Sequence, residues 1–188
     1  MMKTYTEDQI FDKVDFTAIP LDYEDYENCT FTNCIFSNLL GIKFSNCQFI
    51  DCNLSNTNLS DTAFREVQFK NCKMIGLHFE DCNLFGFELS FDNCQLNHSS
   101  FYKVKLCKIK MLDTKLVEVD FTDCDLTKAF FDNCDFLGAV FSNVNLEKAD
   151  FRSSLNYIIS PEDNRLKKTK FSYPAVLGLL DKYDVVVD

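Results

Sequence analysis

The stretch that decides the fold reads Asn46-Cys47-Gln48-Phe49-Ile50-Asp51-Cys52-Asn53-Leu54-Ser55-Asn56-Thr57-Asn58-Leu59. A large apolar side chain recurs at every fifth residue, at Phe49, Leu54 and Leu59, and the residue two positions before each of them is small. A period of five matches neither the 3.6 residues of a helical turn nor the two-residue alternation of a strand. The repeat therefore predicts a structural unit of its own, which points one large and one small side chain inward per five residues.

The same period runs through most of the chain, and we call the large apolar residues its centres. The first expected centres are Phe11, Phe16, Leu21, Tyr26, Phe31 and Phe36. After an apparent three-residue insertion near Leu39-Leu40-Gly41, the expected centres are Phe44, Phe49, Leu54, Leu59, Phe64, Phe69, Met74, Phe79, Leu84 and Leu89. After a two-residue insertion within residues 85–93, they are Leu96, Phe101, Leu106, Met111, Leu116, Phe121, Leu126, Phe131, Phe136, Phe141, Leu146 and Phe151.

A chain that turns a corner at every repeat forms a square coil with four centres per coil. This pattern resembles the pentapeptide repeat family, which has a right-handed quadrilateral β-helix. The expected fold is an all-β solenoid of about seven coils over residues 1–153, followed by a C-terminal helical cap or dimerisation element over residues 154–188. In the expected register Phe36 stacks on Leu59, and Leu89 stacks on Met111.

Composition narrows the classes of protein that fit. The 188 residues carry a formal net charge of −10, with no apolar run long enough to span a bilayer and no apolar signal-peptide core at the start. We expect a cytoplasmic protein that binds neither a membrane nor nucleic acid directly, because an acidic surface repels phosphates. A protein that itself binds DNA is a plausible partner for such a chain.

Ten cysteines raise the question of a metal site or disulfides. Nine of them occupy the small inward position, and Cys29, Cys52, Cys72 and Cys94 are expected to form one column. A line of parallel side chains does not surround a metal tetrahedrally, so we expect buried free thiols and no metal or other cofactor. Cys107 follows a centre and is expected to point outward.

No residue pattern typical of catalysis emerges from the sequence. His78 and His98 lie at different repeat positions and are expected at the surface, and the glycines form no phosphate-binding loop. The protein is therefore not expected to be an enzyme, and a thiol-dependent activity at Cys107 ranks last among the functional hypotheses.

Charge is segregated once the repeats are folded onto four faces. The face that contains Phe79, Phe101 and Phe121 gives a candidate partner-binding surface, formed by Asp61, Glu80, Asp81, Asp120 and Asp123. The opposite face is also expected to be acidic, and the face of Leu106 and Leu126, which lies between them, is expected to be mildly basic.

The C-terminal residues leave the expected repeat. Ser160-Pro161-Glu162-Asp163 has the composition of a helix start. A second helix is expected after Pro174, with one apolar face formed by Val176, Leu179, Leu180 and Tyr183. This face either covers the end of the solenoid or pairs with a second copy of the chain.

The segment Ile159-Ser160-Pro161-Glu162-Asp163-Asn164-Arg165, followed by Gly178-Leu179-Leu180 and Val185-Val186-Val187, resembles the C-terminus of one branch of the family. That branch includes Qnr-type quinolone-resistance proteins and peptide-antibiotic immunity proteins. The resemblance implies a homodimer joined at the C-terminal element, which mimics DNA, binds DNA gyrase or topoisomerase IV and protects the enzyme from quinolones. A structural scaffold for a different protein partner is the alternative.

Overall fold

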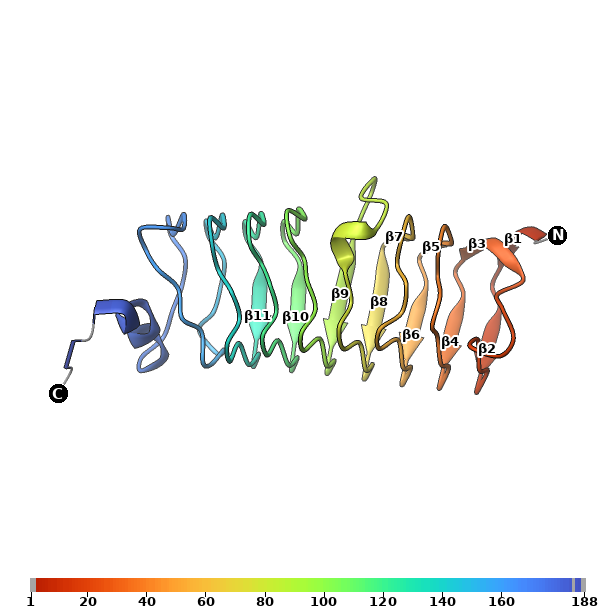
Figure 1. Cartoon of the computed structure of the whole chain (residues 1–188), viewed down its shortest axis with the longest axis horizontal. Coiled ribbons are helices and arrows are strands. Elements are labelled where there is room, and N and C mark those ends of the chain that lie inside the picture. Colours follow the sequence, from red (N-terminus) through yellow and green to blue (C-terminus); the bar gives the residue numbers. More distant parts are fainter. Residues whose placement is uncertain (1–2, 184, 187–188) are drawn as a thin grey trace.

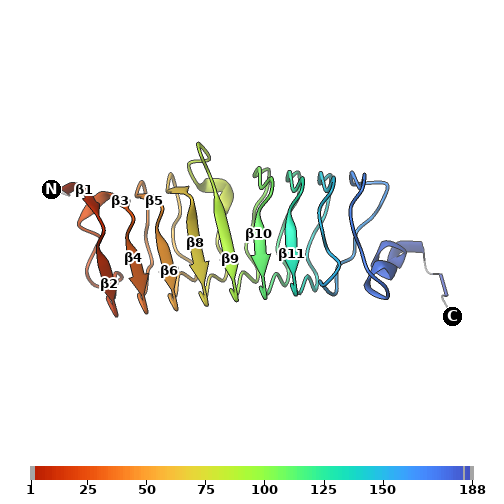
Figure 2. The same cartoon turned by 180° about the vertical axis from the view of Figure 1, so that it is seen from behind.

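The computed structural model describes residues 3–183 and 185–186. The chain forms a long rod of stacked coils, with the two termini at opposite ends (Figures 1 and 2). All strand pairs are parallel and join equivalent positions of successive coils. The expected all-β quadrilateral solenoid is confirmed.

Two of the four walls contain regular strands. One wall holds a seven-stranded sheet of β2 (Ile10–Asp12), β4 (Thr30–Thr32), β6 (Gln48–Ile50), β8 (Val67–Lys70), β9 (Leu89–Asp92), β10 (Lys110–Leu112) and β11 (Phe130–Asp132). Another holds a four-stranded sheet of β1 (Lys3–Glu7), β3 (Tyr23–Glu27), β5 (Lys43–Ser45) and β7 (Ala63–Arg65). The other short elements are the 3-10 helices η1 (Phe79–Asp81), η2 (Ala175–Leu179) and η3 (Asp181–Tyr183).

We number the four walls as faces, in the order in which the chain visits them. The first face contains Phe11, Phe31, Phe49, Phe69, Phe91, Met111, Phe131, Phe151 and Phe171. The second contains Phe16, Phe36, Leu54, Met74, Leu96, Leu116 and Phe136. The third contains Leu39, Leu59, Phe79, Phe101, Phe121 and Phe141, and the fourth contains Tyr26, Phe44, Phe64, Leu84, Leu106, Leu126, Leu146 and Leu166.

Most corners are turned by a left-handed residue two positions after the centre. Asn56 follows Leu54 with φ +56°, and Asp61 follows Leu59 with φ +53°. Asn, Asp and Gly tolerate this region best, so they recur at these corners. The Asn56 N–H donates to Ile75 of the next coil at 2.8 Å, and the Thr57 N–H closes the turn onto Leu54 at 3.1 Å.

The core consists of apolar columns that run along the rod. The rings of Phe79, Phe101 and Phe121 are stacked, with centroid separations of 4.3 and 5.5 Å and interplanar angles of 3° and 1°. The smaller inward residues lie between the columns, and their polar atoms bond to the preceding coil: the Thr62 hydroxyl donates to the Leu39 carbonyl at 2.7 Å. Both inward residues of a repeat therefore contribute to stacking.

The structure corrects the expected register at the first interruption. Leu39 is a fully buried centre whose N–H donates to Asn58 at 2.9 Å, so it stacks on Leu59. The step from Phe36 to Leu39 is two residues shorter than a normal repeat, and the expected three-residue insertion was wrong. The six centres before it therefore shift by one face, and Phe36 stacks on Leu54 instead of Leu59.

The second interruption lies within residues 85–93, as expected, but before Leu89 rather than after it. Phe91 pairs with Phe69 in the first face, while Leu89 pairs with Val67 and fills the small inward position. The expected centre Leu89 was therefore wrong, and the two extra residues lie between Leu84 and Phe91. They form the loop that projects from the rod in Figure 1.

The repeat continues past the expected boundary at residue 153. Parallel bridges join Asn145 to Arg165 and Asp150 to Lys170, and Leu166 and Phe171 pack against the core. The segment after Ser160 forms a turn rather than the expected helix. Asn164 occupies a small inward position there, where its side chain accepts from the Val144 N–H at 2.8 Å.

The end of the rod is covered by η2 and η3 rather than by one amphipathic α-helix. Ala175 and Leu179 of η2 pack against the core. Gly178 lies so close to Tyr157 that a Cβ at this position would overlap the Tyr157 carbonyl oxygen. The C-terminal element therefore caps its own chain.

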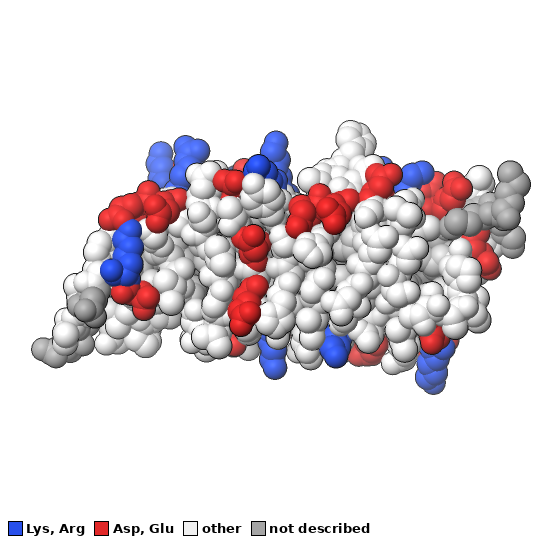
Figure 3. All heavy atoms as spheres, in the orientation of Figure 1, with Lys and Arg blue, Asp and Glu red and all other residues white. Residues whose placement is uncertain are grey.

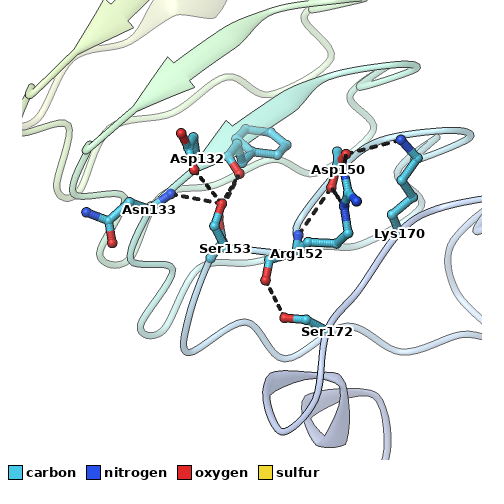
Figure 4. A network of polar contacts seen from close by, with 9 residues as sticks. Asp132, Asn133, Asp150, Arg152, Ser153, Lys170 and Ser172 are labelled. Atoms are coloured by element: carbon cyan, nitrogen blue, oxygen red, sulfur yellow. Dashed lines mark hydrogen bonds and ion pairs between the residues drawn. The ribbon is translucent and has the colours of Figure 1, made fainter.

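A polar network joins the last coils beneath this cap (Figure 4). Asp150 accepts hydrogen bonds from Arg152 Nε at 2.9 Å and Nη2 at 2.8 Å, and from Lys170 Nζ at 3.2 Å. The Ser153 hydroxyl donates to Asp132 at 2.6 Å, and the Ser172 hydroxyl donates to the Arg152 carbonyl. The Arg152 hydrogen bonds are the main reason why the Asp150 pKa falls from 3.8 to about 2.

Replacing Phe101 by Ala removes a fully buried ring from the middle of its stack. We expect the free energy of unfolding to fall by about 3–5 kcal/mol, because the cavity between coils cannot collapse easily. Leu137→Ala, at a side chain that is 57% exposed, is the control and should cost about 0.5 kcal/mol or less. If chemical denaturation shows the same loss of unfolding free energy for both variants, this placement of Phe101 is wrong.

Replacing Asp150 by Asn tests the network by pH. Because the folded pKa is lowered from 3.8 to about 2, the carboxylate stabilises the fold above pH 4 and loses this contribution as the pH falls towards 2. We expect Asp150→Asn to cost about 2 kcal/mol at pH 7 and to reduce the loss of stability between pH 4 and 2. The free energy of unfolding of both proteins is measured by chemical denaturation as a function of pH. If it falls equally for both between pH 4 and 2, Asp150 does not have this role.

Candidate functional site

The five acidic residues proposed from the sequence lie on the third face. Asp61, Asp81 and Asp123 occupy the same corner position in their coils, two residues after a centre. The Asp61 N–H donates to the Asp81 carbonyl at 2.9 Å, so these residues come from adjacent coils, about 4.8 Å apart along the rod. Glu80 and Asp120 flank the centres of the same face.

Local hydrogen bonds hold several of these carboxylates in place. Asp61 accepts from the Asn83 side chain at 3.1 Å, and Asp123 accepts from the Asn143 side chain at 2.6 Å. Asp120 accepts from the Thr122 N–H at 2.8 Å. Acidic side chains gather along the upper half of this face in Figure 3, while the basic ones lie mainly on its upper and lower edges.

The corner that carries the acidic row also holds one lysine. Lys103 lies between Asp81 and Asp123 in coil order and has the same left-handed backbone as Asp61 and Asp123, with φ values of +61°, +53° and +60°. Lysine and aspartate are therefore both compatible with this corner.

The opposite, first face is not the second acidic wall expected from the sequence. The corrected register moves Asp25 and Glu27 to the fourth face, and Glu88 lies in the loop before Phe91. The residues next to the first-face centres are then nearly balanced in charge: Asp12, Asp51, Asp92, Asp113, Asp132 and Asp150 against Lys13, Lys70, Lys110, Arg152 and Lys170. Acidity is thus concentrated on one side of the rod.

The basic character of the fourth face is confined to its C-terminal half. Lys108, Lys128, Lys148 and Lys168 occupy equivalent left-handed corners of successive coils. None of the four forms a salt bridge with a residue in the described part of the chain. In the sequence this row is visible as four lysines at 20-residue intervals. The net charge summed over the whole face does not reveal it.

The cysteines lie where the repeat predicts, with one change of column. Nine are buried and Cys107 is exposed. Cys34, rather than Cys29, shares a column with Cys52, and its N–H lies 3.4 Å from the Cys52 sulfur. Burial, followed by contact with Asp125, raises the pKa of Cys107 and lowers its thiolate fraction. This environment does not favour a nucleophilic role for Cys107.

The histidines and the possible metal ligands complete the survey of polar groups in the described residues. His78 and His98 are exposed, as predicted, and pair with Glu80 and Glu118 at 3.1 Å. Among the residues that the structure describes, no three His, Cys, Asp or Glu side chains are placed to hold a metal ion. No helix within residues 3–183 or 185–186 is long and apolar enough to cross a membrane.

The four residues proposed as a C-terminal apolar face are divided between two environments. Leu179 packs against the core and Val176 is half-buried. Leu180 and Tyr183 remain 40% and 44% exposed. The Tyr183 hydroxyl contacts Glu162, and Lys182 donates to the Ser160 hydroxyl at 2.8 Å, so η3 is held against the last turn.

Comparison with known proteins agrees with this architecture. The family model described as a pentapeptide repeat region matches residues 24–90 and 87–157. No curated protein matches the chain.

Several solved structures are similar to this chain. Trypsin-treated QnrB1, a plasmid-mediated fluoroquinolone resistance protein, is 21% identical over 100% of this chain and 99% of its own, with a TM-score of 0.45. HetL, a pentapeptide repeat protein involved in heterocyst differentiation regulation from the cyanobacterium Nostoc sp. strain PCC 7120, is 13% identical over 86% of this chain and 88% of its own, with a TM-score of 0.36.

The two matched segments of the family model together span well over half of the sequence, and they cover most of the coils described above. The chain belongs to the pentapeptide repeat family.

Proposed function

We propose that the protein is a non-enzymatic mimic of DNA that binds DNA gyrase or topoisomerase IV through its third face and protects the enzyme from quinolones. The observation that carries the proposal is the row of carboxylates on one wall of a rigid rod, formed by Asp61, Glu80, Asp81, Asp120 and Asp123.

The physical reason lies in how proteins recognise DNA. A surface that reads phosphates carries Lys and Arg in an arrangement that suits a regular line of negative charge. Here the backbone ladder fixes the spacing of the carboxylates, and hydrogen bonds from Asn83 and Asn143 orient two of them. Little conformational entropy is then lost when a basic groove binds this face.

The charge row can be reversed without disturbing the corners that present it. Because Lys103 has the same left-handed conformation, Asp61→Lys with Asp123→Lys should leave the coil intact. We expect the double variant to bind gyrase at least about tenfold more weakly at low salt, with a flatter salt dependence. Lys103→Asp, which extends the acidic row, is the matched control and should bind more tightly.

The measurement is a supercoiling assay with purified gyrase, with and without ciprofloxacin, alongside direct binding. Each reversal removes one surface hydrogen bond, so the melting temperature should change little. Absence of protection by the wild type at any concentration would reject the proposed activity. Protection that the double variant retains in full would instead favour a scaffold with another partner.

We also infer that the protein forms a homodimer through its C-terminal element. Leu180 and Tyr183 stay exposed after η2 has covered the core, and Val185 and Val186 are 53% and 90% exposed. These side chains form an apolar end to the rod that a second copy could cover.

Replacing Leu180 by Glu places a charge at the centre of this end without removing a core contact. We expect a soluble monomer with an unchanged melt, because Leu179 and Ala175 still cap the chain. Leu137→Glu, a similar change on the body of the rod, should remain dimeric. A monomeric wild type at micromolar concentration in analytical ultracentrifugation would contradict the dimer.

A further inference from the structure

The fourth face contains a break in its backbone ladder. In the regular coils, a ladder bond joins the Asn83 N–H to Thr62 at 2.9 Å and the Asp125 N–H to Val104 at 3.2 Å. The equivalent bond from the Lys105 N–H to the Cys82 carbonyl is missing, although both residues lie within the described part of the chain. The two coils that meet here are therefore not joined along this face.

The missing bonds leave complementary groups on the two facing edges. Leu106 and Lys108 donate to the following coil at 2.8 and 2.9 Å, but the equivalent N–H groups of Leu84 and Gly86 have no partner among the described residues. The carbonyls of Lys105 and Cys107, which would accept those bonds in a regular coil, also lack them. Each edge thus offers both donors and acceptors.

The two extra residues before Phe91 account for the break. They let the chain turn back, so that the Glu88 N–H donates to Phe64 at 3.1 Å and the Val67 N–H donates to Glu88 at 3.0 Å. Phe87 takes the place of Leu84 beside the core and contacts the Phe64 ring, while Leu84 becomes 44% exposed. The loop residues are therefore paired with the preceding coil, and the edge that faces the following coil is left without its ladder bonds.

The break is hollow rather than filled by side chains. Two open hollows of about 550 and 510 Å³ lie along it, and both are lined by Phe87, Glu88 and Lys105. The smaller one also contacts Leu84 and Gly86 on one edge and Val104 on the other. The larger one has Leu106, Cys107 and Ile109 in its wall.

The charge around the hollows is mainly positive. Lys103, Lys105, Lys108 and Lys110 line them, against Glu66 and Glu88. None of these lysines forms a salt bridge with a described residue. The lysine row of Lys108, Lys128, Lys148 and Lys168 starts at this break, and Figure 3 shows basic side chains along the upper edge on the C-terminal side of the projecting loop.

We propose that this break is a docking site for an extended, acidic segment of a partner protein, which completes the parallel ladder between residues 82–86 and residues 104–108. An extended backbone supplies alternating N–H and C=O groups that match both open edges, as in strand addition at a sheet edge. Acidic side chains on the segment meet the lysines at the rim, which form no salt bridge within the described chain. This site adjoins the acidic third face, with Lys103 at their common corner, but it does not depend on the gyrase proposal.

A deletion of Phe87 and Glu88 provides a matched variant with a closed wall. It leaves Cys82-Asn83-Leu84-Phe85-Gly86 followed by Leu89-Ser90-Phe91, which restores the five-residue step and keeps Gly86 at a left-handed corner. We expect this variant to fold with the Lys105 N–H paired. A second variant, Lys105→Glu with Lys108→Glu, keeps the break open and reverses its charge at two exposed positions.

The probe is a phage-displayed library of random heptapeptides, selected against the wild-type protein. We expect Asp- and Glu-rich peptides that bind the deletion variant and the charge-reversed variant at least tenfold more weakly, and that lose binding when their backbone is N-methylated. Bound peptide should slow thiol labelling of Cys107, the only exposed cysteine in the described chain. The Lys105 amide should exchange hydrogen faster than those of Asp125 and Asn145, and become protected when peptide binds.

Three outcomes would overturn the proposal. A Lys105 amide as protected as that of Asp125 in the free protein would mean that the wall is closed. If the wild type selects no more peptides than the charge-reversed variant does, the rim does not recognise acidic segments. Selected peptides that tolerate backbone N-methylation would mean that binding occurs without strand addition.

Discussion

The structure depends on one constraint: each corner must place its backbone groups opposite those of the next coil. At most corners a left-handed residue two positions after the centre makes this possible, because it turns the chain while its N–H still reaches the neighbouring coil, as Asn56 does to Ile75. The apolar columns follow from that alignment. Phe101 stacks between Phe79 and Phe121 because the backbone brings equivalent positions into line. Surface charge is then ordered by the same alignment, as in the row of Lys108, Lys128, Lys148 and Lys168.

This constraint explains which parts of the fold the sequence can predict. The five-residue period identifies the square solenoid because large and small inward residues recur at fixed intervals over many coils. It fails where a repeat changes length. Leu39 was missed because its step from Phe36 has only three residues, and Leu89 was taken for a centre because it is as large as one. In both places hydrogen bonds between coils decide the register. The amino-acid type at a single position does not predict these hydrogen bonds.

The candidate acidic face was predictable because all its residues lie after the first interruption, and because the two-residue length of the second insertion was expected correctly, so that Asp120 and Asp123 keep their face although Leu89 was misassigned. Asp61, Asp81 and Asp123 fall on one corner in both the expected and the observed register. The expected second acidic wall failed for the opposite reason, since Asp25 and Glu27 precede the missed centre and move to another face. In the C-terminal element, close packing of Gly178 on Tyr157 selects short 3-10 turns, a tertiary effect that an apolar i, i+3, i+4 pattern cannot reveal.

A solenoid has one further property that bears on function: a change in repeat length acts only on the coils next to it. The short step before Leu39 preserves its ladder, because the Leu39 N–H still bonds to Asn58. The long step before Phe91 does not, because its extra residues find partners on the preceding coil and leave the following one unpaired. The columns on the other faces continue through this level, with Phe79 still stacked on Phe101 and β9 still paired with β10. The rod can therefore hold an open backbone edge in one wall while three others keep it rigid, which an ordinary sheet edge cannot do.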